Sequence, residues 1–143
     1  MIRIALVGSI GSGKTFISKL FLHPVFNADL EVEKIYKKNK KFFFELKKKL
    51  PKYFSSFPIE KNQLIKSILD NNNNLKTIIK VVHPIVRLKL KNFLKANKNK
   101  KIVILDIPLY FENKLNNKND VVIFIQSKKK DIKRRLKKRK SFN

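Results

Sequence analysis

The segment of this chain with the clearest chemical potential is Gly8-Ser-Ile-Gly-Ser-Gly-Lys-Thr15. Its pattern, a glycine followed after four residues by glycine, lysine and threonine, is typical of a loop that binds phosphate groups. Glycines let backbone N–H groups turn inward around phosphate oxygens. Lys14 can reach the β and γ phosphates of a nucleotide, and Thr15 can offer its hydroxyl to Mg²⁺. An accidental match is the minor alternative, because the three glycines of the chain all lie in this segment.

Two aspartates follow short apolar segments and are candidates for acid–base or metal chemistry. Asp29 comes after Val25-Phe26, where a carboxylate can accept the proton of an attacking hydroxyl group or orient that group. Its alternative role is the N-cap of a helix that begins near Leu30. Asp106 ends the apolar run Ile102–Leu105 and can hold a Mg²⁺-bound water, or it can cap a turn. Position in the sequence leaves both choices open.

Further charged side chains have candidate roles of their own. His83 stands beside a proline in the segment where an acceptor substrate would be held, and Arg87 lies four residues on, although such a histidine is more often structural. Arg135 and Arg139 share one face of a lysine-rich helix. They can stabilise charge on a transferred phosphoryl group, or they can belong to a solvated basic face. Glu112 is expected to cap a helix or bond a loop, with ligand binding as the minor alternative.

The elements that position these residues alternate between strands and helices. Apolar segments predict buried parallel strands at 2–7, 101–106 and 121–125, and a short further strand at 25–26. Helical spacing predicts helices at 14–22, 30–50, 61–69, 75–82, 85–94 and 131–140, with an interruption at His83-Pro84 and a loop at 71–74. We therefore expect an α/β fold of the P-loop NTPase type: a parallel sheet flanked by helices, with a helical substrate-binding insertion.

The composition indicates a globular protein with a strongly basic charge. The 143 residues are 43% hydrophobic, contain no cysteine and carry a formal net charge of +25. No apolar run approaches the roughly 18 residues that a membrane span needs, and no secretory signal is visible, so we expect a cytoplasmic protein without a membrane partner. The excess charge is nearly all lysine and is spread along the chain. This spread favours compositional drift over a nucleic-acid interface, so we expect no specific nucleic-acid partner.

Five segments, taken in order, resemble the dephospho-CoA kinase family. They are Gly8–Thr15, Asn27-Ala-Asp29, His83-Pro84, Asp106-Ile-Pro-Leu-Tyr-Phe-Glu112 and Arg135-Leu-Lys-Lys-Arg139. Many kinases share the first segment, whereas the histidine–proline pair and the block that ends at Glu112 are much more specific. The resemblance spans nearly the whole chain. It implies a kinase that uses ATP and Mg²⁺ to phosphorylate the ribose 3′-hydroxyl of dephospho-CoA, giving coenzyme A and ADP.

The motifs and the resemblance together give expected roles for individual residues. Asp29 matches the catalytic base, with Lys14 and Arg135 as further catalytic residues. The residues implied to bind ATP are Gly8, Gly11, Ser12, Gly13, Lys14, Thr15, Phe16 and Arg139. The residues expected to bind the acceptor are His83, Arg87, Asp106 and Glu112. Those expected to bind Mg²⁺ are Thr15 and Asp106. Residues 1–143 form a single kinase domain in this interpretation, with an acceptor-binding insertion at 30–100 and the start of a lid at 128–143.

The chain departs from the family pattern in three places. Family members usually have aspartate at the position of Asn27 and often have glycine at the position of Ser9. They also continue for several dozen residues past the lid arginines, so we expect this chain to be C-terminally truncated and not fully active. We expect a monomer or a weak homo-oligomer. The alternative functions are another small-molecule or nucleotide P-loop kinase, and a basic nucleic-acid-binding protein that hydrolyses ATP.

Overall fold

The computed structural model describes residues 1–138 of the 143-residue chain. Two compact units make up this part of the protein. The sheet unit contains Met1–Ala28 and the described residues from Phe93 onward, and the helical unit contains Asp29–Asn92. None of the helices within residues 1–138 is long and apolar enough to cross a membrane.

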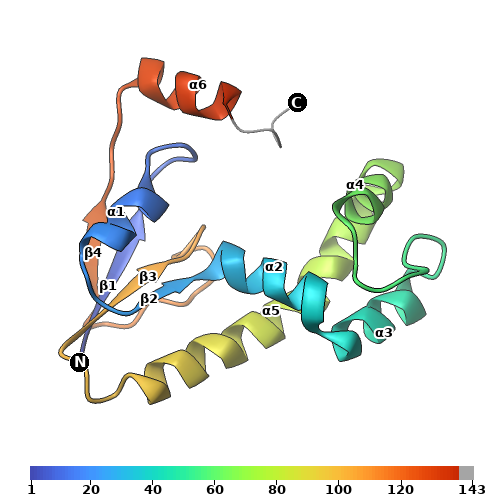
Figure 1. The fold of residues 1–143 in the computed structure, drawn as a ribbon, viewed down its shortest axis with the longest axis horizontal. Helices are drawn as coiled ribbons and strands as arrows, with labels where there is room; N and C mark the ends of the chain where they lie inside the picture. The colour runs from blue at the N-terminus through green and yellow to red at the C-terminus, as the bar shows by residue number, and fades with distance from the viewer. Residues whose placement is uncertain (139–143) are drawn as a thin grey trace. The chain divides into compact units, whose positions relative to one another are not determined.

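The sheet unit is built on a parallel sheet, which confirms the expected α/β fold (Figure 1). Its strands are β1 (Ile2–Val7), β2 (Val25–Asn27), β3 (Ile102–Asp106) and β4 (Val121–Phe124), in the order β2-β3-β1-β4. The central strands β1 and β3 are rich in isoleucine, leucine and valine, as expected for strands that are covered on both faces. Leu6, Ile104 and Ile125 form the buried centre of this unit.

The register of the sheet places three residues in one row at its carboxyl edge. Leu6 of β1 lies opposite Asp106 of β3, which in turn lies opposite Asn27 of β2. The connection from β1 leads past β3 to β2, and the connection from β3 leads past β1 to β4, so the two central strands are connected to opposite edges of the sheet. Ligands of open α/β sheets bind in the crevice at this point. The helix α1 (Lys14–Leu20) follows β1, and α6 (Lys129–Lys137) follows β4.

The helical unit is formed by α2 (Ala28–Lys38), α3 (Lys40–Lys49), α4 (Lys61–Asp70) and α5 (Asn72–Ala96). α2 contributes its residues from Asp29 onward, and α5 contributes its residues up to Asn92. Its core combines aromatic and aliphatic side chains, among them Ile35, Phe42, Leu46 and Phe54, each almost inaccessible to solvent. In α3 the buried residues recur at the three- and four-residue spacing of one helix face. Burial of these apolar faces holds the helices together.

The sequence predicts one helical stretch over 30–50, but the structure has two helices separated at Asn39. The Asn39 side chain accepts a hydrogen bond from the backbone N–H of Phe42 at 2.9 Å. This contact is the N-cap interaction that asparagine favours, and it begins a new helix.

The asparagine run at 71–74 is predicted to be a loop, and this prediction is wrong because α5 begins at Asn72. The side chains instead make short local bonds near the helix ends. Asn71 accepts from the backbone N–H of Asn73 at 2.9 Å, and Asn74 donates to the Ser67 carbonyl at 2.8 Å. Asparagine side chains favour such bonds to the backbone, so a run of them can join two helices without an intervening loop.

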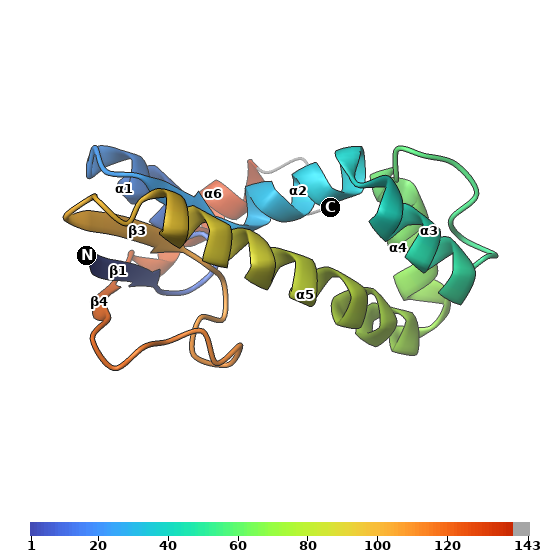
Figure 2. The same ribbon diagram turned by 90° about the horizontal axis from the view of Figure 1, so that it is seen from below.

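The sequence also predicts an interruption at His83-Pro84, whereas α5 runs through Pro84 as one helix (Figure 2). A proline inside a helix removes one backbone hydrogen bond, here that of the Lys80 carbonyl, and costs about 3 kcal/mol. Lys80 and Pro84 are both exposed, so water can satisfy the carbonyl. Val81 and Val82 are buried, and burying such side chains stabilises by about 1.5–3 kcal/mol each. Packing therefore outweighs the lost hydrogen bond.

Candidate active site

The loop Gly8–Thr15 links β1 to α1 in a conformation that gives all three of its glycines a positive φ. Gly8 has a φ of 145°, and a Cβ atom there would lie 2.3 Å from the carbonyl oxygen of Ile125. Gly13, the N-cap of α1, has a φ of 102° in the left-handed region that other residues rarely adopt. Strand, glycine-rich loop and helix thus follow in the order that a phosphate-binding loop needs.

Replacing Gly8 with alanine is expected to displace this loop, because the new methyl group would overlap the Ile125 carbonyl. Backbone strain of this kind costs on the order of 1–3 kcal/mol, so we expect a lower melting temperature together with loss of ATP binding. Ser9→Ala, at the exposed neighbouring residue, is the matched control. Thermal melting with and without ATP gives both readouts. ATP binding at the wild-type level in Gly8→Ala would show that the close approach is not required.

The Lys14 ammonium group lies across the loop. Its Nζ atom donates to the carbonyl oxygens of Gly8 at 2.8 Å and Ser9 at 3.0 Å. The buried Ser12 hydroxyl has no hydrogen-bond partner among the described residues, although buried polar groups normally have one. Phosphate oxygens are charged and bind an ammonium group more strongly than neutral carbonyls do. Lys14 can therefore exchange its carbonyl contacts for phosphate contacts.

Asp106 is the centre of a short hydrogen-bonded row beside the loop. Its Oδ2 atom accepts a hydrogen bond from the Thr15 hydroxyl at 2.7 Å and another from the Asn27 side-chain amide, also at 2.7 Å. Only 3% of Asp106 is exposed to solvent. The row forms because β1, β2 and β3 are parallel and in register, so their carboxyl ends meet. Asp106, at the end of β3, therefore connects the phosphate-binding loop to β2. These contacts go beyond the alternative role, in which Asp106 would only cap a turn.

Thr15 and Asp106 form an oxygen pair of the kind that Mg²⁺ prefers. This ion takes one or two protein oxygens and fills its other positions with water and substrate phosphates. Residues 1–138 hold no group of three or more histidine, cysteine, aspartate or glutamate side chains placed to bind a metal ion. The hydroxyl and carboxylate at the end of the loop therefore fit a cation that arrives together with a nucleotide.

Arg135 reaches the same loop from α6. Its Nη1 atom donates to the carbonyl oxygens of Gly11 at 3.2 Å and Ser12 at 3.1 Å, and to the Ser127 hydroxyl at 3.1 Å. The Ser127 hydroxyl in turn donates a hydrogen bond to the Ser12 carbonyl at 2.8 Å. A Cβ atom at Gly11 would meet side-chain atoms of α6 at 3.2–3.3 Å, so helix and loop are closely packed. The structure thus brings Arg135 to the loop, while its contact with a transferred group stays a prediction.

A pocket of about 350 Å³ opens beside Lys14. Its walls come from the end of β1, the start of the loop and the segment that follows β3, and they include Gly8, Tyr110, Glu112 and Phe124. Apolar walls with a few charged groups are typical of sites for small organic ligands. Glu112 lines the same pocket as Lys14, so the two residues can meet one ligand.

Three predicted site residues, Asp29, His83 and Arg87, belong to the helical unit, and their approach to the loop stays a prediction. Asp29 is exposed and lies in the first turn of α2, which begins at Ala28. It is therefore not the N-cap residue that the alternative role required. His83 is half-buried and Arg87 is exposed, one turn apart on α5.

Two predicted ATP-binding residues add less to the observed site. Phe16 lies on α1 with its side chain 69% exposed, so its contact with ATP stays a prediction. Arg139 lies outside the described residues.

Three contacts at or near the site are not among those that the sequence analysis predicts, and they involve Ser127, Arg3 and Asn27. Ser127 lies just past β4, so the rule that site residues follow parallel strands could have found it. Arg3 is a charged residue within an apolar strand, a pattern that predicts a buried partner. The bond from Asn27 to Asp106 depends on β2 lying next to β3, and no local pattern gives that order.

Comparison with known proteins identifies one family. The family model described as dephospho-CoA kinase matches residues 2–143. The dephospho-CoA kinase of Wolbachia sp. subsp. Brugia malayi is 35% identical over 127 residues, which are 85% of this chain and 65% of that protein. The dephospho-CoA kinase of Bartonella henselae is 32% identical over 129 residues, which are 87% of this chain and 66% of that protein.

A solved structure is similar in fold over nearly the whole chain. The crystal structure of TT1252 from Thermus thermophilus has a TM-score of 0.79 and 26% sequence identity, covering 99% of this chain and 74% of that one. The matched part is just under two thirds of the length of the Wolbachia and Bartonella relatives, at 65% and 66%.

Proposed function

The chain belongs to the dephospho-CoA kinase family, and on this premise we propose that it transfers the γ-phosphoryl group of ATP to the ribose 3′-hydroxyl of dephospho-CoA. The products are coenzyme A and ADP. The contact between Thr15 and Asp106 at 2.7 Å, beside Lys14, carries the proposal. It joins a phosphate-binding loop to a strand-end acid, as phosphoryl transfer with a divalent cation requires.

The proposed reaction makes one bond and breaks one. The 3′-oxygen of the ribose bonds to the γ-phosphorus, and the bond from that phosphorus to the β,γ-bridging oxygen breaks. The proton of the 3′-hydroxyl passes to the carboxylate of Asp29, the proposed general base. The exposure of Asp29 in the first turn of α2 supports this role, because a substrate can reach the carboxylate.

The sheet unit would supply the groups that act on ATP. Lys14 would bind the β and γ phosphates, and Arg135 would stabilise charge on the transferred group. Thr15 and Asp106 would hold Mg²⁺, which neutralises phosphate charge when bound. Gly8, Gly11, Ser12 and Gly13 would bind phosphate through the loop backbone, with Phe16 and Arg139 as further proposed contacts.

The acceptor would be bound by His83, Arg87, Asp106 and Glu112. Dephospho-CoA carries a diphosphate, and basic side chains such as Arg87 recognise phosphate through charge-assisted hydrogen bonds. The net charge of +25 favours polyanionic small molecules in general. We further propose a cytoplasmic protein, a monomer or weak homo-oligomer, without a specific nucleic-acid partner.

A direct assay tests this function. The purified protein is incubated with ATP, Mg²⁺ and dephospho-CoA, and mass spectrometry follows coenzyme A and ADP, which should appear in equal amounts. Adenosine and AMP serve as competing acceptors. Faster phosphorylation of AMP than of dephospho-CoA would favour the alternative kinase, and hydrolysis of ATP that RNA stimulates would favour a nucleic-acid-binding ATPase. A folded protein that forms no coenzyme A would overturn the proposal.

Asn27→Asp is expected to make the stability of the protein depend more strongly on Mg²⁺. Asn27 donates to Asp106 at 2.7 Å, so aspartate there would place two carboxylates against each other. Without a cation we expect a loss of about 1–3 kcal/mol, and with Mg²⁺ a recovery larger than in the wild-type chain. Thermal melting at increasing Mg²⁺ measures this, with Asn27→Ala as the control that removes the donor without adding charge. An equal Mg²⁺ response in both variants would contradict the predicted proximity to the cation.

A further inference from the structure

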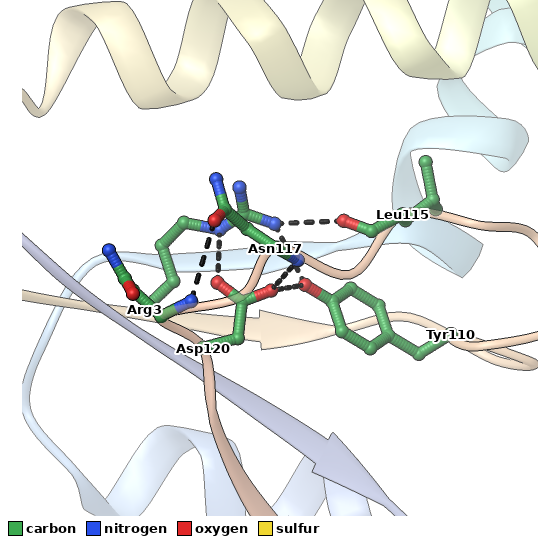
Figure 3. A network of polar contacts seen from close by, with 6 residues as sticks. Arg3, Tyr110, Leu115, Asn117 and Asp120 are labelled. Carbon is green, nitrogen blue, oxygen red and sulfur yellow. Dashed lines mark hydrogen bonds and ion pairs between the residues drawn. The ribbon is translucent and has the colours of Figure 1, made fainter.

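A buried polar cluster ties β1 to the loop between β3 and β4 (Figure 3). Arg3 Nε and Asp120 Oδ1 form an ion pair at 2.9 Å, and the two side chains are 17% and 2% exposed. Arg3 Nη2 donates to the Tyr110 hydroxyl at 2.8 Å and to the Leu115 carbonyl at 2.9 Å. Asp120 Oδ2 accepts from the Tyr110 hydroxyl and, at 2.6 Å, from the backbone N–H of Asn117. We refer to these residues as the Arg3 cluster.

The Arg3 cluster orients the groups that it joins, and its contribution to the net stability of the protein is expected to be small. A buried ion pair gains little overall, because the cost of removing both charges from water offsets their attraction. The Arg3 guanidinium, by contrast, is a rigid planar group, and the hydrogen bonds from its Nη2 atom set the positions of the Tyr110 hydroxyl and the Leu115 carbonyl. The Tyr110 hydroxyl accepts a hydrogen bond from Arg3 and donates one to Asp120, so two partners fix the orientation of the tyrosine side chain.

The loop 107–120 needs such an anchor. Leu109 and Lys114 have φ values of 52° and 53°, in the left-handed region that is unfavourable for residues with a side chain. The backbone bonds inside the loop include short local turns, such as that from Lys114 N–H to the Phe111 carbonyl at 2.9 Å. Unfavourable backbone conformations persist only where the surrounding structure holds them. The contacts with Arg3, which lies on a central strand, provide that support.

The same loop forms one wall of the pocket beside Lys14, where all residues from Ile107 to Glu112 line it. Tyr110 takes part in both structures: it lines the pocket, it is 2% exposed, and its hydroxyl lies in the Arg3 cluster. Burial, together with the hydrogen bond to Asp120, raises the pKa of Tyr110 to about 12. The hydroxyl therefore keeps its proton at neutral pH and remains a donor.

We propose that Arg3, Tyr110 and Asp120 are positioning residues that hold the loop 107–120 as the acceptor wall of this pocket. The proposal rests on the proposed function, because it takes the acceptor to be dephospho-CoA. Arg3 is not among the residues that line the pocket, so it acts through the loop. Loss of one cluster contact loosens the wall and weakens acceptor binding. ATP binding, which uses the loop Gly8–Thr15, changes little.

Tyr110→Phe tests the proposal most directly, because it removes one hydroxyl and keeps the buried ring. We expect the KM for dephospho-CoA to rise about tenfold, while kcat and the KM for ATP stay within about twofold. Hydrogen–deuterium exchange is expected to become faster in peptides from 107–120. Arg3→Lys keeps a charge near Asp120 but loses the planar fork, so it should act in the same direction.

Tyr53→Phe is the matched control, since its hydroxyl also contacts an aspartate, Asp70, but in the helical unit. An unchanged KM for dephospho-CoA in Tyr110→Phe, or exchange in 107–120 equal to that of the wild-type chain, overturns the proposal. Faster exchange throughout the sheet unit also overturns it, because the cluster would then serve general stability. If the wild-type protein forms no coenzyme A, the proposed function fails, and the exchange measurement still decides whether the cluster holds the loop.

Discussion

Asp29→Asn is expected to lower kcat by about 10²–10⁴-fold, the usual contribution of a positioned general base. Asparagine keeps the size and most of the hydrogen-bonding capacity of aspartate, but it cannot accept the proton of the 3′-hydroxyl. Because Lys14, Thr15 and Asp106 are unchanged, the affinity for ATP should stay near the wild-type value. Single-turnover formation of ADP at saturating dephospho-CoA measures the chemical step, and isothermal titration measures ATP binding.

Glu33→Gln is the matched control for Asp29→Asn. Glu33 lies one turn further along α2 and pairs with Lys37 at 2.6 Å on the exposed face of the helix. Both variants remove one negative charge from α2, and even the charge of Asp29, in the first turn, is worth only about 0.3–1 kcal/mol to the helix. A large loss of kcat in Asp29→Asn alone would therefore reflect chemistry. If both variants keep kcat within threefold of the wild-type value, Asp29 is not the base.

The strands and the phosphate-binding loop were predictable because their signals are local. β1 and β3 are short and mainly apolar. β1 is followed directly by Gly8, and β3 ends at Asp106, so each leads to a residue type that phosphate or metal chemistry needs. The rule that parallel strands deliver their carboxyl ends to one crevice then brings the loop and Asp106 together. The contact between Thr15 and Asp106 is what that rule predicts.

The errors arose where tertiary packing outweighs local preference. Pro84 is a reliable helix breaker in isolation, yet the buried face of α5 on both sides of it keeps the helix continuous. Asn39 and Asn71 are the same residue type, but Asn39 lies at the start of α3 and Asn71 lies at the end of α4. At Pro84 the deciding contacts are apolar, whereas each asparagine accepts a hydrogen bond from a backbone N–H two or three residues further along the chain.

Arg135 shows what neither composition nor spacing can decide. Its helix is rich in lysine and arginine, so a solvated basic face was as reasonable as a role at the loop. In the structure its neighbour Arg134 pairs with Asp131 at 2.9 Å, whereas Arg135 itself contacts the Gly11 and Ser12 carbonyls. The two arginines differ only in which helix face they occupy, and the packing of α6 on the loop sets that face.

Lys14→Met is the second variant with a large expected effect. Methionine has nearly the length of lysine but no charge, so it removes the ammonium group that would follow the γ-phosphoryl group during transfer. Loss of one such electrostatic contact typically lowers kcat by about 10²–10³-fold, and we expect a weaker affinity for ATP in addition. Rapid-quench measurement of ADP formation, together with titration of ATP, separates the two effects.

Lys19→Met is the matched control, because Lys19 is an exposed lysine on the last turn of the same helix. Both changes remove one charge from α1, so a general effect of the basic field would lower ATP binding equally in the two variants. Lys14 differs in one respect: its Nζ atom lies on the Gly8 and Ser9 carbonyls, inside the loop. If Lys14→Met retains kcat within tenfold of the Lys19→Met control, the loop binds phosphate through its backbone alone. The ammonium group would then serve only to order the loop before the nucleotide arrives.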